Sequence, residues 1–493
     1  MAGIYGADVG QLRALSKQLS VSSSKLMSAR GALSREVHGS GSWKGYDADR
    51  FRSDWDRTHS ALLVRVSRAL EVAGKAVAVH ADEQEKASSS AGGAAAHNGF
   101  GGKGTGSDGK LPGRTDHSVP RHPDRGEANL SASEVDRLQG LVRDAADDND
   151  FFEGNDRDVN ELREALSALT PGQVDQLLMS LTDEQLQALA GGAAAGGTGL
   201  FNWEGTTPFE RQQLLDQLLS KASPDQVDRL TALIPWSQPN GEAMGDAARP
   251  GGADPSTTNQ WMEPTAPVIG ERPSRDDIRQ GQYGDCVVLA AAGAMINADP
   301  GWAQAHVTDN GNGTVSVLLF DKNGQEQWVT VTSDLPANAA GGQMGASPGQ
   351  GGNWAAYVEK ALAQVYTEDD NRDGTAEGAP PDAAHEPGNY RAIEGNWGPD
   401  AFQYLAGPDV ERTSDAGVLW DAADDGRPSL VTTRGETPEG APPGYHAGHA
   451  YFVTGTDGRG NIILQNPWGP HEPTMTISRD EFSRLFSDAT VAR

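Results

Sequence analysis

Two long stretches rich in glycine, proline and serine interrupt the chain, and they constrain its fold more than any other feature. The first covers residues 87–128 and the second residues 239–268. Neither has an apolar periodicity that could bury a face, so we expect both to be flexible linkers. Glycine and proline are frequent throughout, with 61 and 28 residues among 493. The sequence therefore predicts a multidomain chain with packed regions at 1–86, 129–238 and 269–493.

The charge balance argues against two classes of partner. The chain carries 40 Lys and Arg against 69 Asp and Glu, a net charge of −29. Such a field repels nucleic acid and anionic membrane surfaces. No apolar run approaches the ~18 residues of a membrane-spanning helix, and the first residues lack the layout of a cleaved signal peptide. We expect no nucleic-acid partner, no membrane span and, if the protein is exported, a route without such a peptide.

The first region, residues 1–86, has the pattern of two amphipathic helices. Apolar residues recur at helical spacing up to Val37, glycines interrupt the pattern at 38–48, and a second apolar stripe begins at Phe51. Two helices joined by a short glycine-rich turn form an antiparallel hairpin. The second stripe is wider than one facing helix can cover. We therefore predict that this α-helical hairpin pairs with another, as a homodimer or with a small partner, in a four-helix bundle.

The second region, residues 129–238, contains four helix-start signals. In each, Ser or Thr is followed three residues later by Glu or Gln, which is the pattern of a capping box. The pairs are Ser131 and Glu134, Thr170 and Gln173, Thr182 and Gln185, and Ser223 and Gln226. No cluster of reactive side chains accompanies them. The sequence predicts a small all-α spacer domain without an active site.

The third region, residues 269–493, mixes strand and helix patterns. Two pairs of alternating apolar segments flank Asn323-Gly324 and Asp457-Gly458, which is the signature of β-hairpins. The predicted strands cover 314–320, 328–332, 450–455 and 461–465. Helical patterns cover 286–297, 354–366 and 479–486. We expect an α+β domain.

The only cysteine of the chain, Cys286, lies at the predicted start of a helix. Two glycines precede it closely, and a run of Ala, Val and Leu follows. Unpaired amides and the helix dipole at such a position favour the thiolate, the reactive form of the side chain. Taken alone, a single cysteine is more often a small buried apolar residue than a nucleophile. The neighbouring sequence decides between the two interpretations.

The segment from Gln280 to Cys286, QGQYGDC, resembles the nucleophile motif of calpain-type, papain-fold cysteine proteases. Further on, GHAYFVTG around His449 resembles the calpain histidine strand, and LQNPWG around Asn466 resembles its asparagine motif. The resemblance implies that Cys286 is the nucleophile, His449 the general base and Asn466 the group that orients the imidazole. It also implies that Gln280 donates to the oxyanion. His446, in the preceding loop, is the alternative base.

The resemblance spans about 270–490 and implies a papain-like (calpain-type) cysteine protease domain acting on protein substrates. Peptide bonds would be hydrolysed through an acyl-enzyme, with no cofactor required. Val287 departs from the pattern, because the family has Trp after the cysteine. A second interpretation is therefore a catalytically silent papain-fold module for binding or toxin delivery. A third, a purely structural secretion partner, leaves the C-terminal half unexplained. Self-processing in the two linkers is a further expectation.

The tripeptide Trp43-Lys44-Gly45, between the two predicted N-terminal helices, resembles the WxG family of type VII secretion substrates. That resemblance covers 1–86 and implies a helical hairpin with a paired partner. It also implies secretion without a signal peptide, so that the protein is cytoplasmic before export. The family's Tyr-x-x-x-Asp/Glu signal is missing from residues 80–85. Together the two resemblances predict a secreted bacterial effector or toxin carrying a protease.

Calcium is the one metal for which the sequence offers candidate ligands. Asp369, Asn371 and Asp373 have the alternate spacing of the first half of an EF-hand loop, but the twelfth position is a proline. Calpain cores also bind calcium beside the nucleophile, and the resemblance assigns that role to Asp277 and Glu359. The segment with Asp369, Asn371 and Asp373 is better explained as a solvated acidic turn, and Asp277 and Glu359 can equally be surface charges.

Overall fold

The computed structural model describes residues 120–146, 156–194, 208–241, 260–321, 323–338, 340–366 and 388–492, with scattered positions between 13 and 52. The chain divides into two compact units, Met1–Gly109 and Lys110–Arg493. In the first unit the described positions are helical, and Arg52 Nε donates a hydrogen bond to Val37 O at 3.2 Å. This contact fits a chain reversal between the two predicted helices. The hairpin stays a prediction, because Trp43 and most of 1–86 lie outside the described residues.

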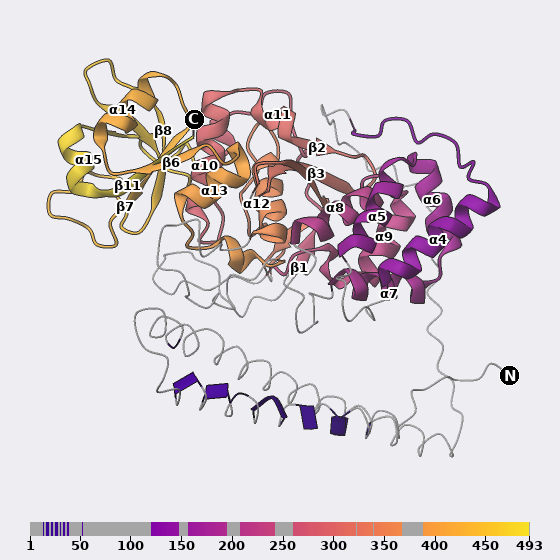
Figure 1. Ribbon diagram of the computed structural model, residues 1–493. Coiled ribbons are helices and arrows are strands. Elements are labelled where there is room, and N and C mark those ends of the chain that lie inside the picture. Colours follow the sequence, from indigo (N-terminus) through magenta and orange to yellow (C-terminus); the bar gives the residue numbers. More distant parts are fainter. Residues whose placement is uncertain are drawn as a thin grey trace. The chain divides into compact units, whose positions relative to one another are not determined.

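The second unit begins with a helical region (Figure 1). Its elements are α4 (Ala132–Ala146), α5 (Asp156–Ser167), α6 (Pro171–Ser180), α7 (Asp183–Ala194), α8 (Pro208–Leu219), α9 (Pro224–Leu233) and the 3-10 helix η2 (Pro235–Ser237). Buried Leu, Val, Ala and Ile side chains give this region a hydrophobic core of its own. The capping boxes at Ser131, Thr170 and Thr182 form as predicted. The fourth prediction is wrong, because Ser223 donates its N–H to Asp175 Oδ1 at 2.7 Å and makes no side-chain cap.

The rest of the second unit is α+β, in agreement with the sequence. Its helices are η3 (Arg275–Asp277), α10 (Cys286–Ala298), α11 (Trp302–His306), α12 (Trp354–Val365), η5 (Tyr390–Ile393), α13 (Gly398–Ala406), α14 (Ala416–Asp424) and α15 (Arg479–Leu485). Its first strands are β1 (Gln260–Met262), β2 (Val307–Asp309), β3 (Thr314–Phe320), β4 (Glu326–Thr332) and β5 (Leu335–Ala337). The later strands are β6 (Val410–Thr413), β7 (Ser429–Thr433), β8 (Ala450–Thr456), β9 (Ile462–Gln465), β10 (Met475–Ile477) and β11 (Phe486–Ala492). The predicted hairpins are confirmed as β3–β4 and β8–β9.

The strands form three antiparallel sheets. Strands β2-β3-β4 form one sheet, β1 and β5 form a second, and six strands in the order β10-β9-β8-β7-β11-β6 form the third. Alternate residues of β8 face opposite sides of the third sheet, as strand geometry requires. Phe452 belongs to the core around α10, α12 and α13, whereas Tyr451 and Val453 belong to the core under α14 and α15. The third sheet thus separates two hydrophobic cores.

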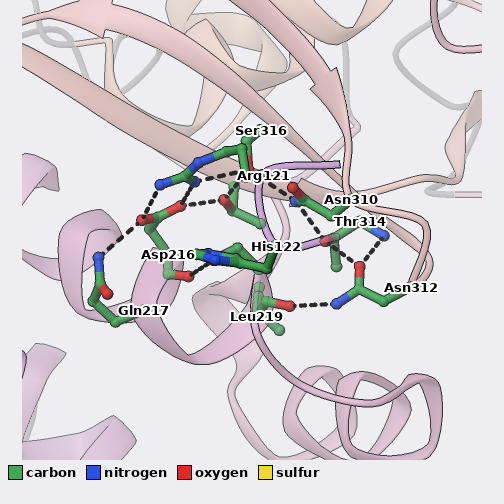
Figure 2. A network of polar contacts seen from close by, with 11 residues as sticks. Arg121, His122, Asp216, Gln217, Leu219, Asn310, Asn312, Thr314 and Ser316 are labelled. Atoms are coloured by element: carbon green, nitrogen blue, oxygen red, sulfur yellow. Dashed lines mark hydrogen bonds and ion pairs between the residues drawn. The ribbon is translucent and has the colours of Figure 1, made fainter. Parts of the chain in front are cut away.

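The helical region packs on the α+β part of the unit through buried polar contacts that the sequence did not predict (Figure 2). The Arg121 guanidinium pairs with Asp216 of α8 and donates to Ser316 Oγ of β3 at 3.1 Å. Thr330 of β4 donates to the same carboxylate at 2.5 Å. Asn312 Nδ2 adds bonds of 2.8 Å to two carbonyls at the end of α8. We call Arg121, His122, Asp216, Asn310, Asn312, Thr314, Ser316 and Thr330 the docking network.

Both predicted linkers therefore need correction at their ends. Residues 120–128 belong to the second unit, since Arg121 and Arg125 are tied to the helical region by ion pairs with Asp216 and Asp175. In the stretch 239–268, residues Gln260–Met262 pair with β5. Composition suggested linkers because polar and glycine-rich sequence gives no local sign of a distant carboxylate or strand. No helix among the described residues is long and apolar enough to cross a membrane.

Candidate active site

Cys286 is the first residue of α10, and it lies at the edge of the core with 9% of its surface exposed. Ten of the helix's 13 residues are buried, so packing fixes its direction. Gly293 faces Phe452 of β8 so closely that a Cβ there would lie 2.7 Å from the ring. The thiol is thereby held at a helix N-terminus, where the dipole favours the thiolate.

The residues before the cysteine, 280–285, form an irregular segment that we call the nucleophile loop. Its backbone is held by distant groups: Gln282 N donates to Met344 O at 2.6 Å, and Gly284 N donates to Glu394 Oε2 at 2.7 Å. Gly281 passes so close to Met344 O that a Cβ would lie 2.1 Å from it. Glycine is required there for a steric reason.

His449 and Asn466 are brought together by strand register. His449 immediately precedes β8 and Asn466 immediately follows β9, and these strands pair with Phe452 opposite Gln465. His449 Nε2 lies 2.9 Å from Asn466 Oδ1. Trp468 N also donates to Asn466 Oδ1, at 3.0 Å, which identifies that atom as the amide oxygen. The imidazole therefore carries its proton on Nε2 and the basic lone pair on Nδ1.

The two halves of the site meet where the nucleophile loop touches the segment after β9. Gln280 N donates to Pro467 O at 2.8 Å. Burial raises the pKa of Tyr451, and the charge of a Cys286 thiolate is among the further causes. The Tyr451 ring lies 5.0 Å from the His449 ring, edge to face. The structure thus brings Cys286, His449, Asn466 and Gln280 into one region.

Trp468 contacts both of the histidines that the sequence offered as bases. Its ring centroid is 4.9 Å from that of His449 and 4.2 Å from that of His446. His449 is buried and bonded to Asn466, whereas His446 is only partly buried. Burial lowers the pKa of His446, so that its ring is neutral around pH 7. The hydrogen bond to Asn466 distinguishes His449 as the oriented imidazole.

Both side-chain amide hydrogens of Gln280 are bonded within the protein. Nε2 donates to Tyr283 O at 2.9 Å and to Asp285 Oδ1 at 3.1 Å. Its buried Oε1 accepts no hydrogen bond from the residues that the structure describes. An oxyanion donor at this position therefore requires the carboxamide to turn.

Three buried carboxyl groups lie in or next to the nucleophile loop. No motif in the sequence pointed to a role for two of them, Asp285 and Glu394. Asp285 precedes the thiol, Glu394 accepts from Gly284, and Glu359 of α12 accepts from Ala346 N at 2.6 Å. Burial, together with the charge of Asp285, raises the pKa of Glu359 well above its usual value. The Gly-Asp-Cys sequence was the only local signal for this cluster.

The two calcium candidates among the described residues, Asp277 and Glu359, both accept hydrogen bonds from protein N–H groups. Asp277 accepts N–H groups from Ser274, Gly351 and the Trp354 indole at 2.7, 2.8 and 3.2 Å, so its oxygens are engaged in capping η3 and fixing a loop. Glu359 is bonded elsewhere, to Ala346. Asp369, Asn371 and Asp373 lie outside the described residues. Within the described residues no group of three or more His, Cys, Asp or Glu side chains could hold a metal.

Comparison with known protein families concerns the part of the site that contains Cys286. The family model "Calpain family cysteine protease" matches residues 254–379. This chain carries a calpain-family cysteine protease domain. The matched range contains Gln280, Cys286 and Glu359 and ends before His449 and Asn466. No curated protein matches the chain.

Proposed function

We propose that the chain is a calpain-type cysteine endopeptidase with Cys286 as nucleophile, His449 as base and Asn466 as orienting residue. The observation that carries the proposal is the 2.9 Å bond between His449 Nε2 and Asn466 Oδ1. It leaves the basic lone pair on Nδ1, in the region where α10 presents the thiol.

The reaction would proceed in two steps. His449 Nδ1 takes the thiol proton, Cys286 Sγ attacks the peptide carbonyl, and the same proton passes to the leaving amine as the C–N bond breaks. Water then attacks the thioester, giving its proton to His449, and the acid leaves as the thiol is restored. The Cys286 amide and a turned Gln280 carboxamide would donate to the oxyanion, each with an effect of roughly 2.7–4 kcal/mol on the barrier.

The N-terminal unit would serve delivery. Trp43-Lys44-Gly45 and the helical pattern of 1–86 support a WxG-type secretion hairpin, paired with a second copy or a small partner. The protein would be a bacterial effector, cytoplasmic before export by a type VII-like route. Calcium at Asp277, Glu359 or the 369–373 segment is an additional proposal, tested by activity and melting temperature in chelator and in millimolar calcium.

Covalent labelling tests the catalytic proposal directly, because the chain has a single thiol. A cysteine-protease epoxide should label the full chain stoichiometrically, and Cys286→Ala should abolish both labelling and cleavage of an unfolded protein substrate. The pH dependence of labelling should report the thiolate–imidazolium pair. A thiol that reacts no faster than free cysteine would overturn the proposal.

A silent papain-fold module is the second candidate, and two observations favour it. Val287 stands where the family has Trp, and both Gln280 amide hydrogens are engaged within the protein. This candidate predicts an unreactive Cys286 in a folded chain, so the labelling experiment separates the two.

A further inference from the structure

The segment that leaves the helical region runs back against the protease domain beside the nucleophile loop. After η2, Asn240 N donates to Gly388 O at 2.7 Å, and Tyr390 N donates to Asn240 O at 2.8 Å. These bonds form an isolated parallel bridge with the start of η5. We call residues 238–241 the exit segment. Backbone hydrogen bonds to Gly388 and Tyr390 hold this segment in place.

Tyr283 connects the exit segment to the nucleophile loop. Its side chain is fully buried three residues before the cysteine, and its hydroxyl donates to Gly241 O at 2.6 Å. The ring stacks on Tyr390 with centroids 4.4 Å apart. Burial and nearby carboxyl groups raise the pKa of Tyr283, so the hydroxyl keeps its proton. The carbonyl of Tyr283 in turn accepts a hydrogen bond from the Gln280 side-chain amide at 2.9 Å.

The helical region itself is held firmly enough to act as an anchor. At one place the docking network joins α8 to β3 and β4 (Figure 2). At another, Gln364 of α12 donates to Trp236 O at 2.5 Å, and Gln238 donates to Asp334 Oδ2 at 3.0 Å. The exit segment begins at that second attachment. A continuous set of contacts therefore leads from the helical region to Gln280.

We propose that the helical region is a fixed brace of the protease and that Tyr283 is the positioning residue through which Gly241 holds the nucleophile loop. The inference rests on the proposed protease function for its catalytic consequence. Without this bond the loop keeps its backbone anchors at Gln282 and Gly284, but Tyr283, which lies between them, loses the contact that holds its side chain. Shifts of Tyr283 would then reach Gln280, whose side chain donates to the Tyr283 carbonyl, and Cys286. The helical region is then part of the active enzyme and not a passive spacer.

Tyr283→Phe in the full chain tests this, with Tyr357→Phe as the matched control. Tyr357 is equally buried, and its hydroxyl donates to Ser333 O at 2.7 Å, away from the nucleophile loop. We expect Tyr283→Phe to lower kcat at least fivefold, with KM within twofold of wild type. Amide hydrogen exchange across 280–286 should become at least tenfold faster. Tyr357→Phe should change neither, although both variants lose one buried hydrogen bond.

The two readouts separate the possible failures. Unchanged exchange at 280–286 in Tyr283→Phe overturns the brace, whether or not the protein is a protease. Faster exchange with unchanged kcat overturns the positioning role alone. Equal losses in both tyrosine variants assign the effect to general stability. A wild-type chain whose Cys286 is unreactive overturns the proposed function, while the exchange result still decides the brace.

Discussion

The β8–β9 hairpin, which carries His449 and Asn466 at its open end, and the docking network use buried polar groups in opposite ways. The hairpin presents one imidazole bonded to one amide at 2.9 Å, under an indole. In the docking network, one carboxylate accepts hydrogen bonds from a guanidinium and a hydroxyl, and the Asn312 amide donates to the carbonyl of Leu219 at the end of α8. Within the network burial lowers the pKa of His122 to about 4, and beside it burial lowers the pKa of Lys221 to about 8. This cluster of buried polar contacts thus marks an attachment, not the candidate chemistry.

The difference follows from what each place has to do. A general base needs a nitrogen whose lone pair can take a proton, so few donors can be aimed at it. An attachment between two separately packed cores must satisfy most of the polar groups that it buries; in the docking network, Asn310 Oδ1 is an exception among the described residues. Changes in the hairpin should therefore affect turnover, and changes in the network should affect stability.

The largest effect is expected for Asn466→Ala. Without the amide oxygen the imidazole loses its tautomer and orientation, so kcat should fall on the order of 10²–10⁴-fold. Unfolding free energy should change by about 1–3 kcal/mol, the net effect of losing the two hydrogen bonds that Asn466 Oδ1 accepts. Steady-state kinetics and urea unfolding measure the two. The control is Asn461→Ala in the turn of the same hairpin, where Asn461 bonds Asp457; equal kcat losses in both variants would contradict the role of Asn466.

Asp216→Ala should show the reverse pattern. It leaves the Arg121 guanidinium without its carboxylate in a site where only 17% of that side chain is exposed, which typically costs about 3–5 kcal/mol. The kcat of the folded protein should stay within twofold, because Asp216 does not bond the nucleophile loop and the exit segment keeps its attachment through Gln364 and Gln238.

Asp183→Ala serves as the control for this stability measurement. Its ion pair with Arg229 is exposed on the carboxylate side, so the loss should stay below about 1 kcal/mol. Urea midpoints of the two variants give the comparison. Similar midpoints would show that the docking network does not stabilise the unit.

The smallest effect is expected from the pH dependence of stability. Burial, and then the charges of Arg121 and Lys221, lower the pKa of His122 to about 4, against the ordinary 6.5; Asp216 acts in the opposite direction. As the pH falls, His122 of the unfolded chain takes up a proton at a higher pH than His122 of the folded chain. The folded state therefore has its full stability above pH 6.5 and loses this part of it as the pH falls toward 4.

His122→Gln should flatten this part of the stability profile. Between pH 7 and pH 4, the melting temperature of wild type should fall by roughly 2–4 °C more than that of His122→Gln. This value is kept small because the His122 side chain is half exposed and its charge interactions are screened by solvent. His471→Gln is the control, because 70% of the His471 side chain is exposed. Identical profiles for wild type and His122→Gln would contradict the assignment.

The local elements were predictable because their signals are local. The β3–β4 and β8–β9 hairpins follow from alternating apolar residues around Asn323-Gly324 and Asp457-Gly458. Helix α10 follows from the apolar run after Cys286. The four candidate site residues were found through three short motifs, and the hairpin register explains why two of them meet.

Other features had no local signal. Strand β11 supplies a central position in the six-stranded sheet between β7 and β6, and neither neighbour is adjacent in sequence. Arg121 lies in a stretch whose glycine and proline content suggested a linker, yet its partner Asp216 is 95 residues away. Nothing in the motif QGQYGDC indicated that Gly241 accepts the hydroxyl of Tyr283.

The sequence by itself determined which side chains are available for chemistry and which segments form helices and hairpins, because these depend on spacing along a few turns or strands. Only the tertiary structure decided that the helical region packs on the protease domain, that Gln280 bonds Asp285 and that Asp277 is occupied by N–H donors. A buried polar group takes whichever partner the packing of distant segments brings within about 3 Å. That choice is made by the whole fold, and no local stretch of sequence records it.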